Sequence, residues 1–148
     1  MRALSAATLS LFLVSASVSF AGPDASKGHL VLIGGGKRPA AVMSRFVELS
    51  GGPSSRILVV PTASELPDTV EAYRKELAAL GATNVAGLDV RTRLDAQRKA
   101  LVEEVEKAGG IFFSGGDQRR IVAALGGTPV GDAIVVCAPD RGEDQRVP

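Results

Sequence analysis

The apolar residues of this 148-residue chain fall into short runs that are separated by longer amphipathic stretches. Continuous runs occupy residues 30–33, 57–60 and 111–113, and Val85, Leu88 and Val90 mark a weaker one between them. Runs without polar alternation are typical of strands that are buried on both faces of a parallel sheet. The pattern therefore predicts four such strands.

The stretches between the runs carry apolar residues at helical spacing. Pro39 opens the first and Pro67 the second, and both stretches end at glycines, which favour helix termination. A third helix is predicted from Asp95, as its N-cap, to Ala108, and a fourth from about Asp117 to Leu125.

The predicted order alternates strand and helix four times, which indicates a three-layer α/β fold. Right-handed crossovers then give a flavodoxin-like parallel sheet with helices on both faces. In such folds ligands bind at the carboxyl ends of the strands. Three turns at these ends therefore deserve inspection, namely residues 34–39 (GGGKRP), 61–64 (PTAS) and 114–118 (SGGDQ).

The first 21 residues have the pattern of an export signal. Arg2 precedes an apolar run rich in small residues, and Ser19-Phe20-Ala21 fits the small-x-small pattern before a cleavage site. A membrane anchor is the rival interpretation, but the run contains several Ser residues and no stop-transfer pattern follows. We therefore expect cleavage after Ala21, a secreted or periplasmic chain, and no membrane contact after cleavage.

Composition narrows the classes of function. The hydrophobic fraction of 45% is enough for a packed core and argues against disorder. Lys and Arg number 17 and Asp and Glu 16, so the charge balance gives no support for nucleic-acid binding. Cys137 is the single cysteine and His29 the single histidine, which excludes an internal disulfide and a multi-His or Cys-cluster metal site. No cofactor or metal is expected.

The glycine-rich turn at residues 34–39 does not match a phosphate loop. A Walker A motif would need Gly in place of Val31 and Ser or Thr in place of Arg38, and Pro39 stands where a Rossmann fingerprint has its third Gly. Two interpretations stay open: a tight strand-to-helix turn, or a bare backbone that a ligand approaches with Lys37 or Arg38 nearby. In the second turn, Thr62 or Ser64 is expected to cap a helix.

The turn at residues 114–118 is the sharpest signal. A buried strand leads through Gly115 and Gly116 into a helix whose first N–H groups lack intrahelical partners and attract negative charge. This arrangement suits an oxyanion hole, and Gln118 could orient a peptide group. Equally, Asp117 could be an ordinary N-cap followed by solvated helix residues.

Together these turns resemble those of the cyanophycinase-like serine peptidases, the family that includes dipeptidase E. The resemblance covers roughly residues 29–134. Its matching segments are IGGGK at 33–37, ILVVPTAS at 57–64 with Pro67 and Tyr73, RTR at 91–93 and GIFFSGGDQRRI at 110–121, continued by Leu125, Gly127 and Thr128.

The resemblance implies a glutamine-amidotransferase-like α/β fold and a serine nucleophile on a Gly-Thr-Ser-Ala-Gly elbow, assisted by a His and an acidic residue. It implies hydrolysis of cyanophycin, a polyaspartate that carries arginine on its side chains, into β-aspartyl-arginine dipeptides. By position, Gly116 and Asp117 would form the oxyanion hole, and Gln118, Gly35 and Gly36 would bind the substrate.

The chain departs from the family pattern at the nucleophile. No Gly-x-Ser-x-Gly sequence occurs in it, Cys137 lacks the glycines of an elbow, and the catalytic His and its acidic partner have no counterpart. We therefore expect residues 22–134 to be the N-terminal part of a truncated domain, residues 135–148 to be a non-matching tail, and the chain to be inactive as it stands.

Two other functions stay open. The chain could be a non-catalytic α/β module that binds peptides or polymers through the Gln118 turn. It could also be a flavodoxin-like domain that binds a phosphate-bearing ligand at the Gly34 turn. The sequence leaves the oligomeric state undetermined.

Overall fold

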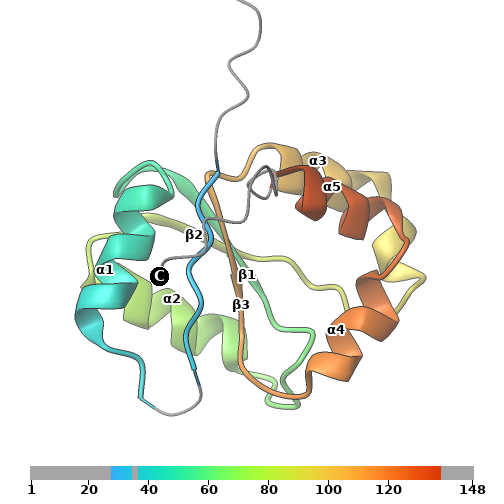
Figure 1. The fold of residues 1–148 in the computed structure, drawn as a ribbon, viewed down its shortest axis with the longest axis horizontal. Helices are drawn as coiled ribbons and strands as arrows, with labels where there is room; N and C mark the ends of the chain where they lie inside the picture. The colour runs from blue at the N-terminus through green and yellow to red at the C-terminus, as the bar shows by residue number, and fades with distance from the viewer. Residues whose placement is uncertain (1–27, 35–36, 138–148) are drawn as a thin grey trace, which may run out of the picture.

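The computed structural model describes residues 28–34 and 37–137 (Figure 1). The predicted signal segment, Gly35, Gly36 and residues 138–148 lie outside the described residues. The elements, in chain order, are α1 (Ala40–Leu49), β1 (Arg56–Val60), α2 (Thr69–Ala79), β2 (Asn84–Gly87), the 3-10 turn η1 (Asp95–Gln97), α3 (Lys99–Glu106), β3 (Gly110–Phe113), α4 (Gln118–Leu125) and α5 (Pro129–Cys137).

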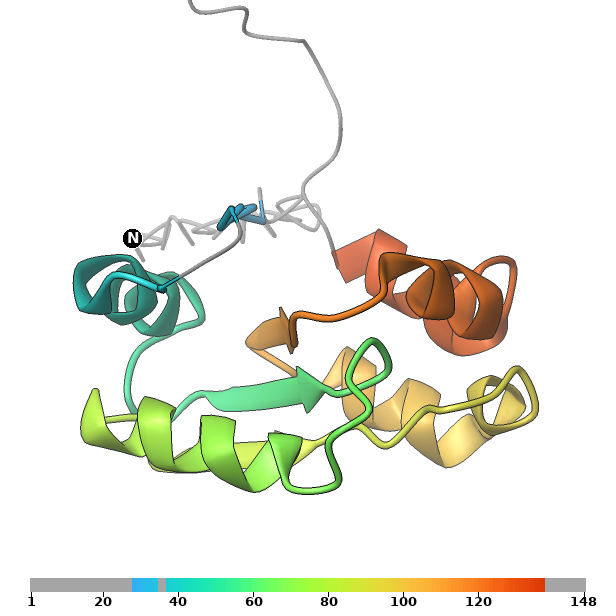
Figure 2. The ribbon, with the colours of Figure 1, turned by 90° about the horizontal axis from the view of Figure 1, so that it is seen from below.

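The sheet confirms the predicted parallel α/β architecture. Its order is β2-β1-β3, and all strands run parallel. Ile57 lies opposite Val85 on one side and Gly110 on the other. Helices α1 and α2 cover one face, and α3, α4 and α5 cover the other (Figure 2).

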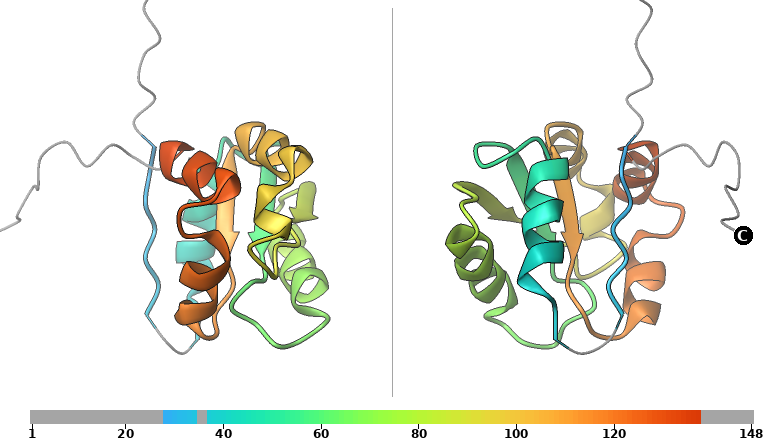
Figure 3. Two further views of the ribbon diagram at one scale, coloured as in Figure 1. Left: turned by 90° about the vertical axis from the view of Figure 1, so that its right-hand side faces the viewer. Right: turned by 60° about the vertical axis from the view of Figure 1, so that its left-hand side comes forward.

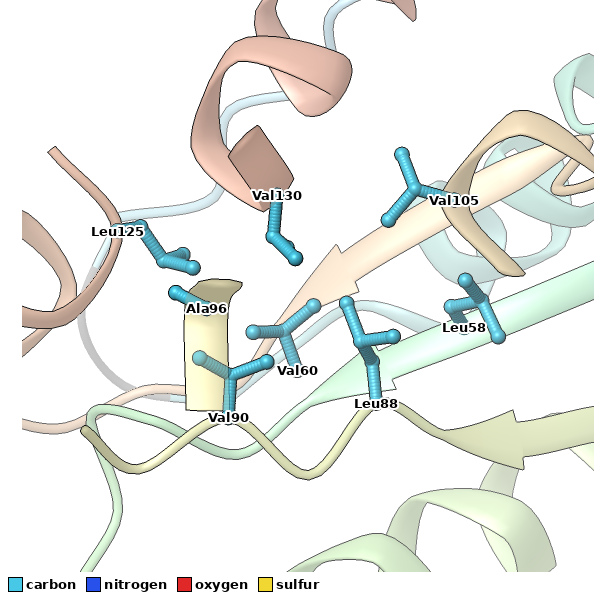
Figure 4. Close-up of a cluster of buried hydrophobic side chains, with 8 residues drawn as sticks. All are labelled: Leu58, Val60, Leu88, Val90, Ala96, Val105, Leu125 and Val130. Carbon is cyan, nitrogen blue, oxygen red and sulfur yellow. The ribbon is translucent and has the colours of Figure 1, made fainter. Parts of the chain in front are cut away.

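The central strand β1 is buried on both faces. Ile57 and Val59 pack with Met43, Val47 and Leu77 from α1 and α2. Leu58 and Val60 belong to the opposite cluster, in which residues from the loop after β2, η1, α3, α4 and α5 converge (Figure 4). The members of that cluster are Leu58, Val60, Leu88, Val90, Ala96, Val105, Leu125 and Val130.

The prediction of a buried first strand at residues 30–33 is wrong for this structure. No residue of 28–34 is assigned to a strand, and the exposed fractions of Leu30 and Leu32 are 69% and 83%. The segment runs beside β3, on the side opposite β1, and pairs with no described strand (Figures 2 and 3). Ile33 packs against the core, whereas no described residue buries Leu30 or Leu32.

The predicted helix from Asp95 to Ala108 is also interrupted. Residues 95–97 form the 3-10 turn η1, Arg98 is extended with ψ 116°, and α3 begins only at Lys99. The carboxylate of Asp95 accepts hydrogen bonds from the backbone N–H groups of Arg91 and Thr92, at 3.1 and 2.9 Å. It therefore closes the loop that precedes it and does not cap α3.

Helix α5 completes the layer on the Leu58 side. It packs against α3 and extends through residues 135–137. The boundary predicted after residue 134 therefore falls inside this helix. In the described part of the chain no single helix is long and apolar enough to cross a membrane; α4 and α5 reach that length and composition only as a pair bent by 112°.

A matched pair of leucine substitutions tests the described core. Leu58→Ala removes a fully buried side chain and is expected to lower the free energy of unfolding by about 2–5 kcal/mol. Leu32→Ala, at the exposed position, should change it by less than about 0.5 kcal/mol. Urea unfolding followed by circular dichroism measures both. A large loss for Leu32→Ala would show that residues 30–33 form a buried strand after all.

Candidate functional site

Two turns at the carboxyl ends of neighbouring strands are held together by backbone contacts. We name residues 61–64 the β1 turn and residues 114–117 the β3 turn. Val60 lies opposite Phe113 in the sheet, and the Ser114 N–H donates to the Val60 carbonyl oxygen at 3.1 Å, so the ladder continues into the turns. Both turns therefore lie at one end of the sheet, at the lower edge of Figure 1.

Gly116 is required where the two turns meet. Its φ of +144° is one that L side chains rarely adopt, and a Cβ on it would lie 2.1 Å from the carbonyl oxygen of Ala63. That same oxygen accepts a hydrogen bond from the Asp117 N–H at 3.0 Å. We call this contact the clasp. It exists only because residue 116 has no side chain.

Arg91 holds the β1 turn from the other side. Its Nη1 donates to the carbonyl oxygens of Pro61 and Ser64, at 3.0 and 2.8 Å. The sequence predicts no role for Arg91 beyond its place in the RTR segment of the family resemblance. The available signal was its place directly after buried Val90, at the same edge of the sheet as the β1 turn.

The structure separates the two predicted oxyanion donors. The Asp117 N–H is occupied by Ala63 in the clasp. By contrast, the N–H groups of Gly115 and Gly116 form no hydrogen bond with any described residue. Gly116 thus presents an open donor, whereas Asp117 holds the turn in place.

Asp117 is the N-cap of α4, one of the two interpretations that the sequence leaves open for this turn. Its carboxylate accepts from the Arg119 backbone N–H at 3.0 Å and pairs with the Arg119 guanidinium at 2.9 Å. These hydrogen bonds from Arg119, with a smaller contribution from the charge of Arg120, lower the pKa of Asp117 below its usual value of 3.8. The cap therefore carries a negative charge at neutral pH.

Gln118 is the first residue of α4 and is exposed beside the clasp. Its side chain forms no hydrogen bond within the described part of the chain, so its amide is available to a ligand. The other two predicted substrate-binding residues, Gly35 and Gly36, lie outside the described residues.

A hollow of about 270 Å³ opens beside the clasp. Residues from all three predicted turns line it. Arg38 lies at it, bound to Glu76 at 2.8 Å and stacked on Tyr73 at 4.8 Å. Ser114 also lines the hollow; its hydroxyl is buried and has no hydrogen-bond partner among residues 28–34 and 37–137. Buried hydroxyls are nearly always bonded, so this one is free to bond to a polar group that enters the hollow.

The expectation that Thr62 or Ser64 caps a helix is wrong. The Thr62 hydroxyl donates to the Val90 carbonyl oxygen at 2.6 Å and so ties β1 to the loop after β2. The Ser64 hydroxyl shares a 2.6 Å hydrogen bond with that of Thr69, and the N-cap of α2 is Asp68. The Thr62 hydroxyl thus bonds to a partner far along the chain, whereas the Ser64 hydroxyl bonds to the loop before α2 and to the first residue of that helix.

No set of three His, Cys, Asp or Glu side chains in the described ranges is placed to hold a metal ion. His29 is exposed on the extended segment, and Cys137 is an exposed free thiol at the end of α5. Neither residue lies among those that line the hollow at the clasp.

Comparisons with known proteins agree on one family. The sequence model of peptidase family S51 matches residues 30–138. Cyanophycinases are similar in sequence: that of Geminocystis herdmanii is 32% identical over 112 residues, which is 73% of this chain and 41% of the relative. That of Synechococcus elongatus is 34% identical over 108 residues, or 70% of this chain and 34% of the relative.

A solved structure extends the agreement to the fold. The crystal structure of a peptidase from an acI-B1 Actinobacterium matches with a TM-score of 0.55 and 28% identity, over 66% of this chain and 43% of that one. The resemblance inferred from the sequence is thereby confirmed. The chain spans about a third to two fifths of the length of the curated relatives described above.

Substitution of the two adjacent glycines tests the clasp. Gly116→Ala places a methyl group against the Ala63 carbonyl and is expected to cost about 1–3 kcal/mol of stability. Gly115→Ala is the matched control, because its Cβ would meet nothing within 4 Å. Thermal and urea unfolding compare the two variants, and equal losses would contradict the close approach at residue 116.

The Asp117 cap predicts an acid dependence of stability. Because the pKa is lower in the folded than in the unfolded state, the ionised cap stabilises the fold at neutral pH, and this contribution is lost as the pH falls through the folded-state pKa. Urea unfolding from about pH 5 downwards should therefore show a shallower loss of stability for Asp117→Asn than for wild type.

The matched control is Asp68→Asn, at the N-cap of α2, where no side-chain cap hydrogen bond forms. An equal change in slope for both variants would contradict the role assigned to the Asp117 carboxylate.

Proposed function

Since the chain belongs to peptidase family S51, we propose that it is the N-terminal, substrate-binding part of an exported serine-type hydrolase that acts on a cyanophycin-like polymer. Its relatives are cyanophycinases, and the chain matches between a third and two fifths of their length. Export rests on the signal-like residues 1–21 and their predicted cleavage site after Ala21.

The clasp is the observation that carries this proposal. It holds the β3 turn where Gly116 leads into α4, whose first residue is the exposed Gln118. An oxyanion hole needs backbone donors that are held rigidly before the charge develops. Gly116 supplies the donor, and the Asp117 N–H, bound to Ala63, supplies the rigidity. Gln118 then orients the peptide group that is to be cut.

The sequence has no counterpart of the family's serine nucleophile or of its histidine base. It holds no Gly-x-Ser-x-Gly sequence, and its one histidine, His29, is exposed on the extended segment. Oxyanion and binding groups without nucleophile and base retain only a small part of an enzyme's rate. We therefore propose that this chain binds the polymer and does not hydrolyse it.

Cosedimentation with insoluble cyanophycin tests binding and turnover in one experiment. The purified chain is expected to bind the granules and to release no β-aspartyl-arginine into the supernatant, as measured by chromatography. Gln118→Ala should weaken binding about tenfold, because it removes an amide with two donors and an acceptor.

Gln97→Ala, at an exposed position in η1, is the matched control and should bind like wild type. Released dipeptide would overturn the proposed inactivity. Equal binding by Gln118→Ala and Gln97→Ala would overturn the assignment of the site.

A further inference from the structure

A second and larger hollow, of about 440 Å³, shares no lining residue with the one beside the clasp. Three arginines from two parts of the chain line it: Arg91 and Arg93 from the loop after β2, and Arg120 from α4. The remaining lining residues are small or neutral, namely Thr62, Thr92, Ala123 and Ala124. We call this site the arginine hollow.

Among the described residues, no carboxylate lines the arginine hollow. Arg91 pairs with Asp89 and Arg120 with Glu65, but both acidic side chains are 77% exposed. Such exposed ion pairs contribute little to stability and are exchanged easily. Arg93 forms an ion pair with no carboxylate in the described part of the chain, so its positive charge is available to attract an anion.

The guanidinium groups keep unused donors. Each has five N–H groups, yet the hydrogen bonds within the described residues use only Nε and Nη1 of Arg91, Nη1 of Arg93 and Nη2 of Arg120. The Thr62 hydroxyl already donates to Val90, so it offers an anion no proton. The Thr92 hydroxyl likewise donates to Asp95. The side-chain donors left for a ligand in the hollow are therefore the guanidinium groups.

Two of the arginines are held in place before any ligand arrives. Arg91 is fixed by the β1 turn, and Arg93 donates to the carbonyl oxygen of Gly126 at 2.8 Å, beyond the end of α4. Binding then costs less side-chain entropy, because these long side chains are already ordered. Arg120, bound only to exposed Glu65, is the one that can turn to the ligand.

We propose that the arginine hollow binds an acidic peptide segment through its side-chain carboxylates. Planar guanidinium forks match carboxylates in bidentate pairs, and a volume of about 440 Å³ exceeds what a single small anion fills. Neither a helix N-terminus nor a glycine nest lines the hollow to favour phosphate. This binding requires the arginines alone and depends neither on hydrolysis nor on the clasp.

Calorimetric titration of the 148-residue chain with a tetra-aspartate peptide tests the proposal. Tetra-aspartate should bind, whereas tetra-asparagine should not. Arg120→Gln should weaken binding about tenfold or more, because one charge-assisted pair is lost, and Arg120→Lys should restore part of it. Glu65→Gln should tighten binding, since it removes the acidic competitor for Arg120.

Arg45→Gln is the matched control: it makes the same change in net charge at another exposed ion pair, with Glu48 on α1. Circular dichroism verifies that each variant is folded. Equal affinity of wild type and Arg120→Gln, an equal loss in Arg45→Gln, or binding of inorganic phosphate in place of tetra-aspartate would each overturn the proposal.

Discussion

Burial of β1 on both faces is the constraint from which the rest of the structure follows. Residues 57–60 are fully buried, with Ile57 and Val59 toward α1 and α2, and Leu58 and Val60 toward the opposite helices. Such a strand must pair on both edges, because its backbone polar groups have no access to water. β2 and β3 meet this need, and their parallel direction brings every carboxyl end to the same edge of the sheet.

The clasp is the structural consequence of that arrangement. Once β1 and β3 are neighbours, the turns that leave them must pass each other closely, and Gly116 permits an approach that a Cβ would block. Arg91 then secures the β1 turn by hydrogen bonds to two of its carbonyl oxygens. The site is therefore built by backbone groups, with a few side chains that hold or extend it.

Much of this could be predicted from the sequence. The apolar runs of β1 and β3 placed two strands correctly. Gly-Gly-Asp-Gln predicted a turn into a helix, and an N-cap at Asp117 was one of the two interpretations of that turn. The predictions that failed concern residues whose hydrogen-bond or strand partners differ from the expected ones. Asp95 bonds backward to Arg91 and Thr92, Thr62 reaches Val90, and the segment with Leu30 and Leu32 finds no strand to pair with among the described residues.

The sequence by itself determined the strand–helix alternation, the family and the turns that matter, because periodicity and glycine placement act over a few residues. Only the tertiary structure decided which groups those turns leave available. The Asp117 N–H donates to the Ala63 carbonyl oxygen, whereas the Gly116 N–H bonds to no described residue. Likewise, Arg91, Arg93 and Arg120 share one hollow although about thirty positions separate the first from the last. The physical reason is that hydrogen-bond partners and charge clusters are set by contacts across the sheet, which local patterns do not encode.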